Sequence, residues 1–335
     1  MKKDLFKQFK NGIFKMDAKC NWLVYGNMFE IYDKDFNFKE HYQLSEKNAM
    51  KIKDILGDNK NIFTSLTDDI LHLEDGYNII KIKKYEIENM DIPNIKTDTQ
   101  INLGKNAMQY AYRLLTQVKS NSKIDIGKYV GFMNNYIFRT DSYQLGNYTV
   151  SHICDKQLSL HENIVKLLEI INDDKIKIDY SEDNIKIETN DYIIIARNYN
   201  LPNLNSVLSQ KSYGYNKLTF NKKDLENLLK SCDKIAIDDV ESKHSIKMNN
   251  YKKDIIFTSK NTDMEIEKKL NTINEIDKNK IVINVGFNIT FVLNYIKNTL
   301  DKKDENIDMF YSNGSSMLYC SKDNYDYIFM PIVLR

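Results

Sequence analysis

The chain has 335 residues, 42% of them hydrophobic and 28% charged, and its formal net charge is +1. This length provides apolar surface for two or three cored domains, and the near-zero charge means that any nucleic-acid role must come from segregated charge rather than bulk basicity. No apolar run approaches the roughly 20 residues that cross a bilayer, and the amphipathic opening at residues 1–6 does not resemble a signal peptide. We therefore expect a cytoplasmic protein.

In the first third of the chain, a helix is predicted over residues 2–12, where apolar residues recur at helical spacing. After Gln43-Leu44-Ser45, a second helix is predicted over 46–56. Two strands separated by an Asp-Gly turn follow within 69–80, and a lone proline, Pro93, closes the unit.

The middle third repeats this order. A short strand and a helix are predicted within residues 101–119. Gln157-Leu158-Ser159 then precedes a helix over 160–171, two strands around an Asn-Asp turn lie within 184–195, and Pro202 closes the unit. The two copies keep register, since their glutamines are 114 positions apart and the tyrosines after their turns are 115 apart. Such a register over fifty residues indicates internal repetition.

The last third is a more divergent copy. A strand and a helix are predicted within 217–233, a second helix over 287–300, and three strands within 307–330 before Pro331. The order predicts three domains of roughly 110 residues each, a usual domain size, with boundaries at 1–97, 98–213 and 214–335.

Helical periodicity also predicts which faces are buried. In the helix after residue 105 the apolar stripe is Ala107, Ala111, Leu114, Leu115 and Val118, and the polar side is Gln109, Arg113 and Gln117. In the helix after residue 222 the inward residues are Leu225, Leu228, Leu229 and Cys232.

Four segments in residues 98–335 carry a family resemblance: FRTDSYQL at 138–145, LPNLNSVL at 201–208, GFNITFVL at 286–293 and YIFMPIVL at 327–334. In order and near spacing they resemble the TDGHRL, FPDYxxVL, FNxxYL and YVMPMRL motifs of the bacterial DNA polymerase III β subunit, the β sliding clamp. Each motif is weak alone, but with the threefold repeat they make the chain similar to that family. Residues 1–97 match in pattern only and are shorter than usual.

The resemblance implies an α+β fold of three repeated clamp domains, each with helices on one side and antiparallel sheets on the other, forming half of a closed ring. Clamps of this family are non-catalytic, head-to-tail homodimers that encircle duplex DNA without sequence preference. They tether the replicative polymerase and are opened by a clamp loader. Joining sheets edge to edge would remove exposed strand edges, which agrees with the repeat pattern.

The resemblance further implies a cleft for partner peptides between the second and third domains. The matched positions are Thr140, Tyr143, Leu145, Pro202, Val207, Asn288, Phe291, Ile328, Met330, Pro331 and Ile332. From periodicity alone, Leu145, Val207 and Ile328 would be ordinary strand core residues. The family's His-Arg pair is replaced by Tyr143-Gln144, so we predict weaker binding of the usual glutamine-plus-hydrophobic motif and a phage, plasmid or otherwise specialised clamp.

Two further sets of residues follow from the resemblance. DNA-facing helices would carry Lys3, Lys7, Lys10, Lys105, Arg113, Lys166, Lys223, Lys230 and Lys297, although solvated helix faces explain each lysine as well. Ring closure would use Ile80 and Ile82 against Ile235 and Ile237, for which ordinary strand alternation is the competing explanation.

Enzymatic interpretations fail on spacing. Residues 33–37 resemble the start of a calcium loop, but Phe38 and Leu44 occupy the glycine and bidentate glutamate positions, which favours a hairpin turn. Gly127-Lys128 is not part of a phosphate-binding loop, because no glycine stands five residues before Gly127. The histidines are not spaced as metal ligands are. The paired aspartates at 68–69, 173–174 and 238–239 fall at expected turns or loops.

The spacing of the cysteines indicates neither a metal site nor a redox site. Cys20, Cys154, Cys232 and Cys320 are scattered, with no Cys-x-x-Cys pair, which predicts buried reduced thiols and no cofactor. Two other classes stay open: a clamp-like decoy or interaction platform that does not encircle DNA, and a polymerase or nuclease accessory with hidden activity.

Overall fold

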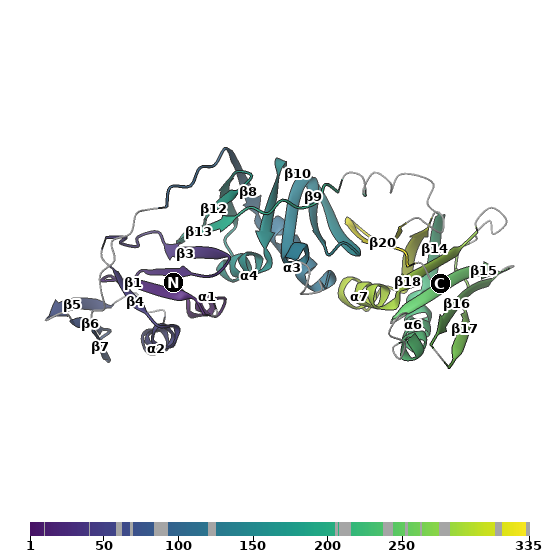
Figure 1. The fold of residues 1–335 in the computed structure, drawn as a ribbon, viewed down its shortest axis with the longest axis horizontal. Helices are drawn as coiled ribbons and strands as arrows, with labels where there is room; N and C mark the ends of the chain where they lie inside the picture. The colour runs from purple at the N-terminus through teal and green to yellow at the C-terminus, as the bar shows by residue number, and fades with distance from the viewer. Residues whose placement is uncertain are drawn as a thin grey trace. The chain divides into compact units, whose positions relative to one another are not determined.

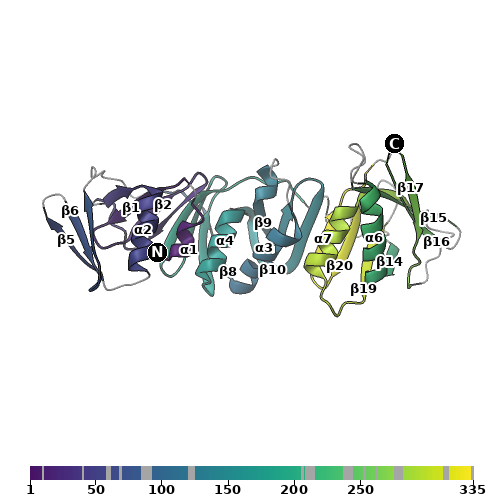
Figure 2. The same ribbon diagram turned by 90° about the horizontal axis from the view of Figure 1, so that it is seen from below.

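The fold is given by a computed structural model. It describes residues 1–9, 11–39, 41–57, 62–67, 70–83, 93–119, 125–204, 207, 216–236, 244–251, 254–261, 263–274, 282–311 and 317–332. The chain forms two compact units (Figures 1 and 2). Unit 1 contains residues 1–112, 132–134 and 153–200, and unit 2 contains 113–131, 135–152 and 201–335.

Unit 1 is built on an eight-stranded antiparallel sheet of order β4-β1-β2-β3-β13-β12-β11-β8, beside a three-stranded sheet, β5-β6-β7. Its strands are β1 (Ile13–Asp17), β2 (Trp22–Tyr25), β3 (Phe29–Asp33), β4 (His41–Leu44), β5 (Phe63–Thr67), β6 (Ile70–Glu74), β7 (Ile79–Lys83), β8 (Thr99–Gly104), β11 (Lys175–Tyr180), β12 (Asn184–Glu188) and β13 (Tyr192–Arg197). Its helices are α1 (Lys3–Phe6), α2 (Glu46–Leu56) and α4 (Glu162–Ile171).

Unit 2 contains a six-stranded sheet of order β14-β19-β20-β21-β10-β9 and a four-stranded sheet, β17-β16-β15-β18. Its strands are β14 (Asn216–Asn221), β15 (Ser245–Tyr251), β16 (Asp254–Lys260), β17 (Glu265–Lys269), β18 (Asn284–Asn288), β19 (Asn306–Tyr311), β20 (Leu318–Lys322) and β21 (Tyr325–Phe329). It shares β9 (Tyr129–Thr140) and β10 (Gln144–His161) with unit 1, which contains residues 132–134 and 153–161 of these two strands. Its helices are α6 (Lys222–Ala236), α7 (Ile289–Thr299), the short 3-10 helix η1 (Asp125–Lys128) and part of α3 (Lys105–Gln117). Helices α6 and α7 lie side by side (Figure 2).

The repeat predicted from the sequence is confirmed in secondary structure. Each of α2, α4 and α7 is followed by three strands that pair antiparallel in chain order. The helix starts are capped by three different side chains, because Ser45, His161 and Asn288 each accept a hydrogen bond from a backbone N–H two or three residues later. The shared element is therefore the helix and its meander, whereas the capping chemistry has diverged.

Two strand pairs join neighbouring repeats into continuous sheets, as edge-to-edge joining predicts. In unit 1, β3 pairs with β13, with Ile31 opposite Ile194. In unit 2, β10 pairs with β21, with Leu145 opposite Ile328. Both pairs cover strand edges that would otherwise be open. The three-domain division remains a prediction, because these sheets each combine two of the repeats.

The predicted opening helix over residues 2–12 is wrong beyond its first turn. Among the described residues of this range only Lys3–Phe6 is helical, and the following backbone hydrogen bonds, such as Phe9 N–H to the Phe6 carbonyl, span three residues rather than four. The rings of Phe6 and Phe9 instead pack against Trp22 and Phe29, with centroids 4.9 and 5.0 Å apart. Tertiary aromatic contacts therefore end the helix early.

Two other expectations need correction. Gln117, expected on the polar side of its helix, is 4% exposed, and its amide bonds the Tyr148 and Thr299 hydroxyl groups. The segment after Asp33 is no hairpin turn, because β3 and β4 lie at different positions of the sheet, with β1 and β2 between them. The inward residues predicted for α6, Leu225, Leu228, Leu229 and Cys232, are buried as expected.

The junction strand β3 carries a half-buried acid that supports a pH prediction. Glu30 lies opposite Ile195 of β13, and burial raises the pKa of its carboxyl above the ordinary 4.5. Because the ionised form is favoured by unfolding, its charge destabilises the fold above the raised pKa, and this effect disappears below about pH 4.5. We expect Glu30→Gln to be more stable than the wild type at pH 7 in urea unfolding and equal to it near pH 4. A constant difference across this range would contradict the assignment.

Candidate functional site

The site begins with a tight turn between β9 and β10, in the first of the four segments. Asp141 organises the turn: its carboxylate accepts hydrogen bonds from the backbone N–H groups of Tyr143 and Gln144 and from the Gln144 side-chain amide. The Thr140 hydroxyl bonds the Gln144 carbonyl oxygen at 2.8 Å. The turn thus fixes where β10 starts.

Strand β21 and the chain after it hold this turn in place. Met330 N–H donates to the Tyr143 carbonyl oxygen at 2.9 Å, and Ile332 N–H donates to the Gly286 carbonyl oxygen at 2.7 Å. The C-terminal segment is therefore fixed between β10 and β18, and it brings two distant motifs together.

A small cleft of about 60 Å³ lies at this junction, wholly within unit 2. Six of the eleven residues expected from the resemblance line it, namely Thr140, Tyr143, Leu145, Val207, Ile328 and Met330. Five further residues, which are not among the eleven expected ones, complete the lining: Ser142, Gln144, Leu204, Met317 and Phe329. The two side chains most open to a partner are Tyr143, 60% exposed, and Met330, 46% exposed.

No ionised side chain lines the described part of this cleft. Gln144 is 4% exposed, and its amide group donates to the Lys119 carbonyl and to Asp141 while its oxygen accepts from the Tyr327 hydroxyl. Burial also raises the pKa of Tyr327, so that hydroxyl stays protonated. Gln144 therefore belongs to the cleft's rigid floor, where it is not free to bond a partner.

The other five expected cleft residues lie outside this lining. Asn288 caps α7 through a hydrogen bond from Thr290 N–H, and the Phe291 ring lies 6.4 Å from the Phe329 ring. Ile332 bridges to Gly286, Pro331 precedes it, and Pro202 is exposed. Phe291 thus lies next to the lining residue Phe329, whereas the Asn288 side chain caps a helix.

The candidate DNA-facing cations are distributed over α3, α4, α6, α7 and the segment around α1. Lys7, Lys166 and Lys230 each pair with an acid on a neighbouring turn: Asp4, Glu162 and Glu226. In the described part of the chain, Lys105, Lys223 and Lys297 form no ion pair. Arg113 is exposed on α3, whereas Lys10 and the side chain of Lys3 lie outside the described residues.

The ring-closure candidates are only partly on strands. Ile80 and Ile82 lie on β7, an edge strand of the three-stranded sheet, with Ile82 buried and Ile80 half-buried. Ile235 lies in α6, which corrects the strand alternation assumed for it, and Ile237 is outside the described residues. The exposed apolar residue of β7 is Ile79, 64% exposed, which the sequence did not single out.

Ser142 supports a prediction at the turn itself. Its φ of 76° is a left-handed conformation that costs an L-residue with a side chain about 1 kcal/mol, and glycine avoids this cost. We expect Ser142→Gly to raise the free energy of unfolding by about 0.5–1 kcal/mol in urea titration. A destabilised variant would mean that the Ser142 hydroxyl contributes more than the backbone strain removes.

The described residues do not support a metal site or a catalytic site built on the paired aspartates or the cysteines. No group of three or more His, Cys, Asp or Glu side chains in that part of the chain is placed to hold a metal ion. Asp173 bonds the backbone N–H of Asn190 at a turn, and the aspartates at 68–69 and 238–239 are outside the described residues. Cys154, Cys232 and Cys320 are buried, and Cys20 is half-buried. None of the described helices is both long and apolar enough to span a membrane.

Comparison with known proteins places the fold. No protein-family model matches the sequence, and no curated protein matches it. Solved structures match over nearly the whole chain. The DNA polymerase III β subunit of Thermotoga maritima is 16% identical with a TM-score of 0.71, covering 99% of this chain and 97% of that one. The β chain of Streptococcus pneumoniae is 13% identical with a TM-score of 0.74, covering 99% and 96%.

A third match is the Helicobacter pylori β clamp bound to a DNA ligase peptide, which is 15% identical with a TM-score of 0.67, covering 99% of this chain and 96% of that chain. These identities are too low to transfer residue roles, but the coverage is nearly complete in both directions. This chain has the α+β fold of the bacterial DNA polymerase III β subunit.

Proposed function

We propose that this chain is a non-catalytic DNA sliding clamp, a homodimer that encircles duplex DNA and tethers a polymerase through the cleft beside β10 and β21. The observation that carries the proposal is the β-subunit fold, matched over 99% of the chain in several solved structures. A clamp loader and a cytoplasmic location belong to the same proposal.

The cleft supports the partner-binding part of this function. It is concave and apolar, it lies where three of the four motifs meet, and two of its side chains are open to a ligand. A groove of this chemistry suits a short hydrophobic peptide segment at micromolar strength, about −8 kcal/mol. Because no cation is available in the described lining, we expect binding of the glutamine-plus-hydrophobic motif without help from charge.

The edge strand β7 supports the dimer part. A strand edge that has no partner among the described residues and carries an exposed isoleucine is a surface that proteins usually cover. If β7 closes the ring against a second copy, a lysine at position 79 would place a charge in that contact. The side chain is 64% exposed within one chain, so the substitution should not disturb the fold.

The test is mass in solution by light-scattering chromatography over a dilution series. We expect a particle near twice 39.5 kDa for the wild type and a monomer for Ile79→Lys. Ile55→Lys, at a position 49% exposed on α2, is the matched control and should remain dimeric. A dimer that is retained on circular but not linear DNA after loading supports encirclement. A wild type that is monomeric at every concentration would contradict the homodimer and favour a clamp-like decoy that binds partners without enclosing DNA.

A further inference from the structure

Two of the described α-helices, α3 and α7, contain no acidic residue. Each of α1, α2, α4 and α6 contains at least one Asp or Glu, whereas α3 and α7 carry only cationic and uncharged side chains. Because the formal net charge of the chain is only +1, attraction to a polyanion must come from such local segregation of charge.

Hydrogen bonds join the C-terminal ends of these two helices within unit 2. The Asn298 side-chain amide donates to the Thr116 carbonyl oxygen at 3.1 Å, and the Gln117 amide donates to the Thr299 hydroxyl oxygen at 3.4 Å. Gln117 is 4% exposed, so this contact belongs to the packed structure. The two helix ends therefore form one continuous surface.

Exposed cations surround this contact, and we call them the helix-end patch. They are Arg113 and Lys119 from the end of α3, Lys297 from the last turn of α7, and Lys302 and Lys303 from the turn after α7. The four lysines form no ion pair with any residue that the structure describes. Lys119, Lys302 and Lys303 were not among the DNA-facing residues expected from the sequence.

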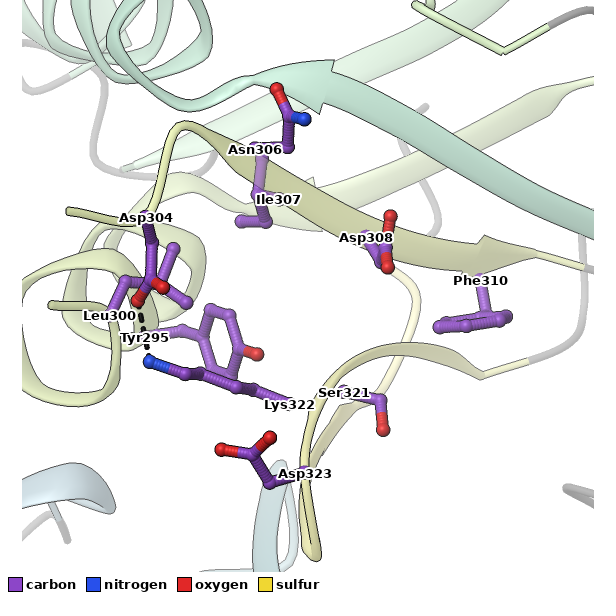
Figure 3. Close-up of a pocket in the computed structure, with 10 residues that line it drawn as sticks. All are labelled: Tyr295, Leu300, Asp304, Asn306, Ile307, Asp308, Phe310, Ser321, Lys322 and Asp323. Atoms are coloured by element: carbon purple, nitrogen blue, oxygen red, sulfur yellow. Dashed lines mark hydrogen bonds and ion pairs between the residues drawn. The ribbon is translucent and has the colours of Figure 1, made fainter.

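Nearby acids do not cancel this patch. Asp304 and Asp301 lie 2.5 and 3.2 Å from the Lys322 ammonium, and Figure 3 shows the first of these contacts. Glu305 and Asp323 are exposed and form no ion pair within the described chain. The five cations of the patch therefore leave an excess of positive charge.

The candidate cations on three other helices are balanced by carboxylates. Lys7, Lys166 and Lys230 lie 2.6, 3.4 and 2.5 Å from an acid on a neighbouring turn. A paired lysine attracts a phosphate group less strongly, because its carboxylate partner repels the phosphate. These three lysines should add little to DNA affinity.

Helix dipoles alone do not account for the patch. A cation in the last turn of a helix is stabilised by the partial negative charge of the helix end, and this explains Lys297. The effect falls off within that turn, whereas Lys302 and Lys303 lie beyond the end of α7.

We propose that the helix-end patch is the part of unit 2 that contacts the phosphate groups of duplex DNA. This assignment rests on the clamp function proposed above and selects which cations serve it. Lysine and arginine side chains bind phosphate oxygens without reading base identity, as a protein that moves along DNA requires.

The experiment measures binding of the full-length protein to a short linear duplex by fluorescence anisotropy, at salt concentrations between about 50 and about 200 mM. The test variant combines Lys297→Gln, Lys302→Gln and Lys303→Gln. We expect its Kd at the lowest salt to rise about fivefold or more. The plot of log K against log salt concentration should become shallower by about 2, because each lysine–phosphate contact contributes about 0.9 to the slope.

The matched control combines Lys7→Gln, Lys166→Gln and Lys230→Gln, which changes the net charge by the same amount. Its Kd should stay within about twofold of the wild type, with an unchanged slope. The double variant Lys302→Gln and Lys303→Gln alters no helix, so it should show part of the loss in affinity at the wild-type urea midpoint.

The outcomes separate this assignment from the clamp function itself. If the wild type binds no duplex at low salt, the clamp function fails and the patch fails with it. If the wild type binds, but the two triple variants lose equal affinity or neither loses any, the patch assignment is overturned while the clamp function stands.

Discussion

Replacing Gly146 with valine is expected to lower the free energy of unfolding by about 3 kcal/mol, because overpacking in a filled core forces neighbouring groups apart. A Cβ atom at position 146 would lie 2.5 Å from Val118 Cγ2, 2.7 Å from the Tyr325 hydroxyl oxygen and 3.1 Å from Leu114 Cδ2. Gly146 stands opposite Tyr327 in the β10–β21 pair, where the second and third repeats join. The absent side chain is therefore what lets α3 pack closely on this junction.

A double-mutant cycle distinguishes this clash from a general strand effect. Val118→Ala removes the nearest contacting atom, so Gly146→Ala should cost less in that background than in the wild type, with a coupling of about 1 kcal/mol or more. The measurement is the urea midpoint of the four proteins in the cycle. Strictly additive effects would mean that α3 does not pack on Gly146 in solution.

The repeated helices and strands could be predicted from the sequence, because the spacing of apolar residues within each element depends only on that element's own residues. The helix expected over 46–56 has those same ends in α2, and the three meanders follow their helices in the predicted order. The prediction of a long opening helix was wrong because of tertiary contacts. The Phe6 and Phe9 rings pack against Trp22 and Phe29, and the spacing of residues along the chain does not reveal these contacts. The exposed position predicted for Gln117 was wrong for a similar reason, because its hydrogen-bond partners Tyr148 and Thr299 lie far from it in the sequence.

The candidate cleft shows the same division between local and tertiary information. Motif matching indicated Leu145, Ile328 and Met330, because these residues lie within the first and last of the four matched segments. It did not indicate Leu204 or Met317, which reach the cleft only after separate segments meet in three dimensions. It also gave no reason to expect that Gln144 would be bonded to Asp141, Lys119 and Tyr327. Position 144 corresponds to the arginine of the β-subunit motif. In this chain the side chain there is the uncharged Gln144, and its hydrogen bonds hold it in the floor of the cleft.

Replacing Tyr143 with alanine is expected to weaken binding of a glutamine-plus-hydrophobic peptide about tenfold or more, because exposed aromatic side chains at the edge of a cleft are common binding hot spots. The ring is 60% exposed, and the contact to Met330 uses only the Tyr143 carbonyl oxygen. The variant should therefore keep the wild-type unfolding midpoint, so that lost binding reports on the cleft itself. Fluorescence anisotropy with a labelled peptide measures the change.

The control and the salt series decide whether the cleft is responsible. Tyr77→Ala removes a tyrosine that is 97% exposed in unit 1, whereas the cleft-lining residues belong to unit 2, and it should leave peptide affinity unchanged. Because the described lining carries no ionised group, Kd should change by less than about twofold between about 50 and about 300 mM salt. A steep salt dependence would show that charged groups outside the described lining bind the peptide. Equal losses for Tyr143→Ala and Tyr77→Ala would remove the cleft from the proposed function.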